Sequence, residues 1–208
     1  MGHHIRGFVA EADALRGAMH RYGHFRVAPL RGGLGFVPLT EALADEMDER
    51  TCERDDGSGR EALAPEILKR VLLRPVEMRV AAELSRGFPL AYIETDYWGG
   101  KGEQFAMAWA GGCVVYGPAG PKRRGPINGA LAALRVRRTA RLTSRRRWAR
   151  LLRVAAGLVG ADEFGNAGLT HYRDMDDFED PESACYQQDY LVKCVARERK
   201  GAWRTFWR

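Results

Sequence analysis

Short apolar runs separated by glycines dominate the stretch from Leu90 to Pro118, and their composition predicts strands. β-Branched and aromatic residues, which favour pleated structure, fill three runs: 90–97, 104–109 and 113–116. Glycines lie between these runs at 99–102 and at 111–112, where they supply the positive φ that tight turns need. We therefore predict a central three-stranded antiparallel meander at about residues 90–117, with the rest of the chain arranged around it.

The first turn of this meander also predicts how two of its strands are paired. If Trp98 lies opposite Glu103, alternate side chains along each strand fall on opposite faces of the sheet. One face is then small and apolar, which suits packed helices, and the other combines large rings with carboxylates. We interpret the second face as an exposed protein-binding surface, formed by Tyr92, Glu94, Asp96, Trp98 and Glu103.

Helical spacing of apolar residues flanks the predicted meander on both sides. Apolar spacing predicts helices over 8–22 and, later in the chain, 127–134, while acidic residues after a cap predict one over 41–47. Pro65 in a tolerated first-turn position predicts a helix over 65–73, and a further helix at 76–87 ends at a glycine. Thr40 is the predicted N-cap of the helix over 41–47, which a polar loop at 48–59 follows, and two β-like runs lie within 25–38. We predict one α+β domain over residues 1–208, an antiparallel sheet with helices packed on its small-residue face.

Length and composition favour a globular protein and exclude several other classes. The chain has 208 residues, of which 45% are hydrophobic and 29% are charged, and these are globular values. No apolar run approaches the roughly 20 residues of a membrane helix, and the N-terminus carries carboxylates where a signal peptide is apolar. The four cysteines form no Cys-x-x-Cys pair, which predicts free thiols rather than a zinc site or a disulfide framework. We expect a cytosolic protein with no cofactor, no catalytic motif and no membrane partner.

The charged residues are distributed unevenly around a net charge of +6. No carboxylate occurs between Glu103 and Asp162, whereas an arginine-rich segment, predicted to be helical, occupies 135–156. Acidic residues concentrate at 41–56 and 174–182, and a basic, aromatic tail ends the chain at 185–208. This asymmetry indicates either an anionic partner or pairing of basic and acidic surfaces within the chain.

The arginine-rich segment raises nucleic-acid binding as an alternative function. Guanidinium groups form paired hydrogen bonds with phosphate, and Trp148 could stack on a base. The candidate contacts are Arg137, Arg138, Arg141, Arg145, Arg146, Arg147 and Arg150. The sequence lacks the common RNA-binding and zinc-finger motifs and has acidic segments near by, so a solvated helix face explains the arginines equally well.

A carboxylate cluster raises a second alternative, a metal-dependent enzyme. Glu94 and Asp96 are two residues apart on one predicted strand, so they point the same way, and Glu103 could approach from the paired strand. Carboxylates gathered in this way can hold a divalent cation or act as acid and base. The other interpretation, that they surround the solvated end of a sheet and pair with nearby arginines, is favoured because such a carboxylate pattern has low specificity, and no histidine lies near them in sequence to strengthen a metal site.

Four segments in order, ETDYWGGKGEQ, YGP, PINGAL and DEFGNAGL, resemble a group of small uncharacterised bacterial proteins. Some of those proteins are similar to immunity proteins of polymorphic toxin systems. The resemblance covers roughly residues 25–173 and implies a non-enzymatic binder of another protein, with no catalytic residues to carry over. The leading prediction is therefore a cytosolic protein-binding module, possibly of the immunity type that inhibits its partner.

Overall fold

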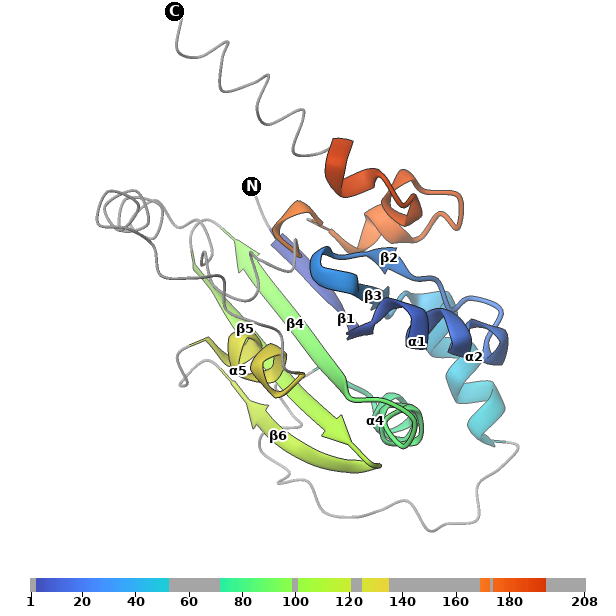
Figure 1. The fold of residues 1–208 in the computed structure, drawn as a ribbon, viewed down its shortest axis with the longest axis vertical. Helices are drawn as coiled ribbons and strands as arrows, with labels where there is room; N and C mark the ends of the chain where they lie inside the picture. Colours follow the sequence, from blue (N-terminus) through green and yellow to red (C-terminus); the bar gives the residue numbers. More distant parts are fainter. Residues whose placement is uncertain are drawn as a thin grey trace, which may run out of the picture.

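An antiparallel sheet of six strands forms the centre of the molecule, in the order β2-β3-β1-β4-β5-β6 (Figure 1). The computed structural model describes residues 3–52, 72–98, 101–120, 125–134, 169–172 and 174–193. The strands are β1 (His3–Glu11), β2 (Ala28–Pro29), β3 (Leu34–Pro38), β4 (Leu90–Trp98), β5 (Lys101–Ala110) and β6 (Cys113–Ala119). The predicted α+β class is confirmed, and the predicted meander is β4-β5-β6.

The strand β1 replaces the first part of a predicted helix. Helical spacing predicted one helix over 8–22, but the helix α1 covers only Ala12–Ala18 and the short 3-10 helix η1 covers Met19–Arg21. β1 pairs with β3 on one side and with β4 on the other, which makes it an inner strand of the sheet. The Phe8 and Val9 side chains are completely buried in the hydrophobic layers on opposite faces of the sheet, so tertiary packing overrides the local spacing.

The pairing of β4 with β5 differs from the predicted register by two residues. Trp98 faces Lys101, and Glu103 faces Asp96 rather than Trp98. Only two residues therefore join these strands, so the turn is tighter than predicted. Because side chains alternate with a period of two, a shift of two leaves each side chain on its predicted face.

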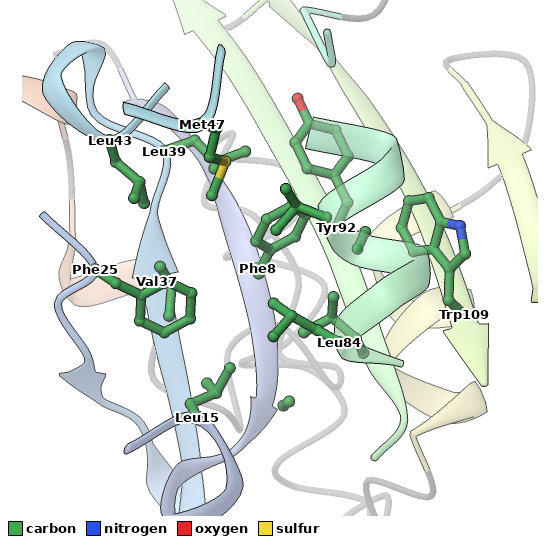
Figure 2. Packing of buried hydrophobic residues seen from close by; sticks show 14 of the residues in the cluster. Phe8, Leu15, Phe25, Val37, Leu39, Leu43, Met47, Leu84, Tyr92 and Trp109 are labelled. Carbon is green, nitrogen blue, oxygen red and sulfur yellow. The ribbon is translucent and has the colours of Figure 1, made fainter. Parts of the chain in front are cut away.

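Helices and 3-10 turns cover both faces of the sheet, whereas the sequence predicted cover on one face only. The large-residue face lies against α1, α2 (Glu41–Cys52) and α4 (Pro75–Leu84). Figure 2 shows side chains of this layer, among them Phe8, Leu84, Tyr92 and Trp109, gathered around α4. The small-residue face lies against α5 (Pro126–Ala133) and the 3-10 helices η3 (Leu169–His171), η4 (Met175–Phe178) and η5 (Ala184–Tyr186).

Most of the predicted helices that fall within the described ranges are present. The Thr40 hydroxyl accepts a hydrogen bond from the Leu43 N–H at 3.3 Å, as expected of an N-cap. α2 continues to Cys52, so the predicted loop at 48–59 is wrong over its first part. The remainder of that loop and residues 65–71 of the next predicted helix lie outside the described residues.

Residues 169–193 fold back onto the sheet beside β2 and β3 (Figure 1). Their anchor is a group of stacked and tilted rings that includes Phe36 of β3: Phe36, Tyr172, Phe178, Tyr186 and Tyr190. The Tyr172 hydroxyl also donates a hydrogen bond to the carbonyl oxygen of Pro29 at 2.5 Å. The predicted tail thus docks on the domain over 185–193, and its last residues, 194–208, lie outside the described part of the chain.

Both edges of the sheet are poorly suited to adding another strand. β2 has two residues, one of them Pro29, which lacks an N–H. β6 contains Pro118 and two register shifts against β5, and such bulges twist an edge away from further pairing. Binding of a partner through strand addition is therefore disfavoured.

None of the helices in the described ranges has the length and apolar character needed to cross a bilayer.

Candidate functional site

The predicted protein-binding face does not form as an exposed surface. Tyr92 is 0% exposed and Glu94 is 3% exposed, because α4 and its neighbours cover this side of the sheet. Phe105, Met107 and Trp109 share the face and provide a large apolar area, whose burial favours helix cover. The prediction of an exposed mixed face was therefore wrong for Tyr92 and Glu94.

Asp96 and Glu103 are the two members of the predicted face that remain exposed. They lie directly opposite each other on β4 and β5, and His4 lies opposite Asp96 on β1. Like charges that face each other across antiparallel strands oppose pairing. The fifth predicted residue, Trp98, is paired within the sheet, but its side chain lies outside the described part.

The predicted metal site is not assembled. Glu94, Asp96 and Glu103 lie on the same face of the sheet, as expected. However, the Glu94 side chain is buried, and its carboxylate already accepts hydrogen bonds from the protein itself. Its Oε2 accepts hydrogen bonds from the Tyr92 hydroxyl at 2.5 Å and from the Leu72 N–H at 3.0 Å. Within the described ranges, no group of three histidine, cysteine, aspartate or glutamate side chains could hold a metal ion.

A buried polar network surrounds Glu94, and the sequence did not predict it. Arg6, which faces Glu94 across β1 and β4, donates from Nη1 to the Leu72 carbonyl oxygen at 2.9 Å. The same Nη1 lies 3.4 Å from Oε1 of Glu77, a residue of α4 that is 0% exposed. Arg6 therefore contacts the chain before α4 and the first turn of α4 at once.

One carboxylate oxygen of Glu77 accepts a hydrogen bond, and the other does not. Its Oε2 accepts from the Arg74 N–H at 2.7 Å, which caps the first turn of α4. Its Oε1 is buried and has no hydrogen-bond donor. The spacing of Arg74, Pro75 and Glu77 is a sequence signal for a helix start, but it does not show that the carboxylate is buried.

Burial governs the ionisation of this network. It raises the pKa of Glu77, and the positive charge of Arg6, the hydrogen bond from the Arg74 N–H and the positive charge of Arg74 offset part of the rise. Burial also raises the pKa of Glu94, although the hydrogen bonds from Tyr92 and Leu72 favour its ionised form. Burial thus raises the pKa of each of these two carboxyls, Glu77 on α4 and Glu94 on β4.

Two acidic segments that are distant in the sequence meet at one contact in the fold. The Glu41 N–H, at the start of α2, donates to Glu179 Oε1 at 3.5 Å. Glu41, Asp45 and Glu49 are exposed on α2. The exposed carboxylates around η4 are Asp174, Asp176, Asp177, Glu179, Asp180 and Glu182. We call these nine residues the α2–η4 acidic surface.

The two halves of the acidic surface differ in how their charges are compensated. On α2, Asp45 lies 3.5 Å from Arg74 Nη1, which also pairs with Asp48 at 3.0 Å. Around η4, none of the six carboxylates lies within salt-bridge distance of an arginine or lysine in the part of the chain that is described. Among the described residues, the carboxylates of the η4 half are therefore the less compensated ones.

The arginines of the nucleic-acid alternative, from Arg137 to Arg150, lie outside the described residues, and that alternative stays a prediction.

Comparison of the chain with protein-family models, with curated proteins and with solved structures gives no match. The resemblance to immunity proteins is therefore neither supported nor opposed by these comparisons, and function is argued from the site.

Proposed function

We propose that this protein is a non-enzymatic protein-binding module and that its α2–η4 acidic surface binds a basic region of another protein. The observation that carries this proposal is the contact between Glu41 and Glu179, which joins two acidic segments across 138 residues of sequence. The proposal moves the interface from the sheet face around Tyr92, which is buried, to a surface that is accessible.

Charge favours a protein partner with a basic surface. The chain carries a net charge of +6, yet nine exposed carboxylates gather on two neighbouring elements. A patch of one sign attracts the opposite sign, speeds encounter and discourages partners of its own sign. A cationic surface on another protein is the chemistry that complements this patch.

The carboxylates around η4 are held in place rather than displayed on a loose loop. Met175 and Phe178 of η4 are buried against the sheet, so the intervening Asp176 and Asp177 point outward from an anchored turn. The Ser183 hydroxyl donates to the carbonyl oxygen of Asp177 at 2.6 Å, which fixes the following residues. A preorganised surface loses less conformational entropy on binding.

An immunity-type role is consistent with this proposal. Inhibition of a partner requires a stable surface that covers it and needs no chemistry at the contact. The resemblance of ETDYWGGKGEQ and the later segments to immunity-like proteins implies such a binder. We therefore propose inhibition of a basic partner as the more specific form of the function.

The test compares two triple variants with the same change of charge. The first is Asp176→Asn, Asp177→Asn and Asp180→Asn, which neutralises part of the η4 half. The control is Asp13→Asn, Asp96→Asn and Glu103→Gln, which removes three exposed carboxylates elsewhere. Each full-length variant and the wild type are used as bait in extracts of the native host.

We expect the wild type and the control to capture the same stoichiometric partner and the first variant to capture at least tenfold less. Capture by the wild type should also weaken as salt rises from low to physiological concentration, because salt screens exposed charges. Equal capture by both triple variants, or loss of capture in the control alone, would overturn the assignment to the α2–η4 acidic surface.

A further inference from the structure

The main chain of β1 makes a hydrogen bond outside the sheet at Arg6. The Arg6 carbonyl oxygen accepts from the N–H of Leu39, the residue that follows β3, at 3.1 Å. The Arg6 N–H donates to Sδ of Met175 in η4 at 3.3 Å. Because β3 ends at Pro38, the methionine sulfur extends the hydrogen bonding of β1 past the end of its neighbouring strand.

The same methionine anchors the turn that carries part of the α2–η4 acidic surface. Met175 and Phe178 are the buried residues of η4, and both pack in the hydrophobic layer on the small-residue face of the sheet. Asp174, Asp176 and Asp177, the nearest acids in the sequence, are exposed. A thioether and a ring therefore position these acids, and the thioether is the one that accepts a hydrogen bond from β1.

Solvent reaches Met175 more readily than it reaches the other buried methionines of the described ranges. Met175 is 8% exposed, whereas Met47 is 0% and Met107 is 1% exposed. Oxidation converts the flexible apolar side chain of methionine into a polar sulfoxide. Met175 thus combines access for a small oxidant with a structural contact at the sulfur atom itself.

We propose that Met175 is a site of reversible oxidation by hydrogen peroxide and that its oxidation releases η4 from the sheet. A lone pair of Sδ attacks one peroxide oxygen, so an S–O bond forms while the O–O bond breaks. The second oxygen leaves as water after it takes up the proton of the first. The thioether loses two electrons, the peroxide gains them, and the product is methionine sulfoxide. Methionine sulfoxide reductases return the sulfoxide to the thioether, which makes the change reversible.

The sulfoxide does not fit the place that the thioether occupies beside β1. An oxygen on the lone pair that accepts the hydrogen bond would lie between Sδ and the Arg6 nitrogen, which are already in direct contact at 3.3 Å. An oxygen on the other lone pair makes the sulfur partly positive, so it no longer accepts from the N–H. In both cases a polar group enters an apolar layer, and burial of a polar group without a partner is unfavourable.

The consequence of oxidation for binding rests on the proposed function, whereas the release of η4 does not. Glu179, which follows η4, accepts from the Glu41 N–H of α2. Release of η4 therefore separates the two acidic segments, and the oxidised protein should bind a basic partner less tightly. Hydrogen exchange in the free protein tests the oxidation alone, and capture of the partner tests the surface, so failure of one is distinguishable from failure of the other.

Hydrogen exchange of the full-length protein before and after treatment with hydrogen peroxide tests the inference. Treatment at about pH 5 keeps thiols protonated and therefore slow to react, and peptide mass spectrometry measures the sulfoxide at each methionine. We expect Met175 to be oxidised well before Met107, and protection in peptides covering 174–183 to fall by about tenfold or more. Peptides covering β4 serve as the internal reference and should not change. Methionine sulfoxide reductases of both stereospecificities should restore the protection.

Two variants assign the effect to one sulfur atom. Met175→Leu keeps an apolar side chain and has no sulfur to oxidise, so peroxide should leave its protection over 174–183 unchanged. Met78→Leu is the matched control, because Met78 is a half-buried methionine of α4, and this variant should respond to peroxide as the wild type does. Both variants retain Cys185, so an effect of peroxide through that thiol would appear in both.

Three results would overturn the proposal. The first is oxidation of Met175 that leaves protection over 174–183 unchanged in the wild type, and the second is oxidation of Met175 no faster than that of Met107. The third is an equal fall in protection in Met175→Leu. If that variant fails to fold, the reductase step decides in its place, because protection that stays low after Met175 is reduced would equally contradict the proposal.

Discussion

The two carboxylate oxygens of Glu77 have opposite effects on stability: one stabilises the start of α4, and the other is a buried acceptor without a hydrogen bond. Its Oε2 caps the first turn of α4 through the Arg74 N–H, which favours helix formation. Its Oε1 has no hydrogen-bond donor although the side chain is fully buried, and its contact there is the ion pair with Arg6 Nη1 at 3.4 Å. A buried acceptor without a donor costs about 1–3 kcal/mol. Glu77 thus raises the free energy of unfolding through its helix cap and lowers it through its buried, unbonded oxygen. Substitution of Glu77 measures the sum of the two effects.

Global stability should report the ionisation of Glu77. Because burial raises the pKa of Glu77 in the folded state above the ordinary 4.5, its stabilising contribution is complete below that value and is lost as pH rises toward the raised value. We expect urea denaturation at pH 5 and pH 8 to show a larger loss of stability in the wild type than in Glu77→Gln. An equal loss in both proteins would contradict this account of the carboxyl.

Glu46 should behave in the opposite way. Burial alone would raise its pKa, but hydrogen bonds from Gly23 and His24 lower it below the ordinary 4.5. Its contribution to stability is therefore present above that value and is lost as pH falls through the lowered one. We expect Glu46→Gln to reduce the loss of stability between pH 5 and pH 3 in the same urea experiment. If the acid-induced loss is unchanged, the Glu46 contacts do not stabilise the loop at 22–25.

Tyr92→Phe isolates one hydrogen bond within the network. The substitution keeps the buried ring and removes the hydroxyl that donates to Glu94 Oε2. Loss of a buried donor to a charged or strongly polar acceptor costs about 1–3 kcal/mol. Urea denaturation near neutral pH should show a destabilisation of that order, and a change below about 0.5 kcal/mol would show that Leu72 alone satisfies the carboxylate.

At the scale of elements, alternation along a strand fixes which side chains share a face but does not show what covers that face. Tyr92, Glu94 and Asp96 share one face, as the sequence predicted. The first two are buried and the third is exposed, because α4 ends its cover before the end of β4 is reached. Whether a face of β4 is buried depends on helices from other parts of the chain. The residues of β4 alone therefore do not show which of its side chains will be covered.

β1 shows the second limit of local patterns. Phe8 and Leu15 are seven residues apart, which suits a helix, yet Phe8 is in a strand and Leu15 is in α1. The meander was predictable because glycines and β-branched residues mark its turns and strands within a short window. β1 was not, because its partners β3 and β4 are both distant from it along the chain.

The packing of β1 on β3 predicts a large effect of Gly7→Ala. A Cβ at Gly7 would lie 2.3 Å from the Val37 carbonyl oxygen and 2.5 Å from the Phe36 ring. Because backbone and a packed ring must both move, we expect a loss of about 1–3 kcal/mol or more in urea denaturation. Gly17→Ala in α1 is the matched control, since its Cβ meets nothing within 4 Å, and it should be neutral or stabilising. Equal stability of the two variants would contradict the close approach of β1 and β3.

At the scale of the whole molecule, the segregation of charge was visible in the sequence, but the site that it forms was not. The acidic segments at 41–56 and 174–182 were recognised separately. Their union at Glu41 and Glu179 depends on residues 169–193 folding back across the sheet through the ring cluster on Phe36. The buried network of Arg6, Glu77 and Glu94 likewise joins three elements that have no local signal in common.

The arginine-rich segment still predicts a competing function, and salt distinguishes it. If Arg137 to Arg150 bind phosphates, affinity for a short DNA or RNA duplex should fall steeply between about 50 and 200 mM salt. Fluorescence anisotropy with a labelled duplex measures this directly. Absence of binding even at the lower salt concentration would remove the nucleic-acid alternative.

The proposal of an acidic binding surface is tested most directly by a hydrogen-exchange footprint of the protein with its captured partner. Addition of the partner should slow exchange in peptides covering 41–49 and 174–182, while peptides covering 90–110 remain as in the free protein. Slowed exchange confined to 96–103, or to any region away from α2 and η4, would contradict the account.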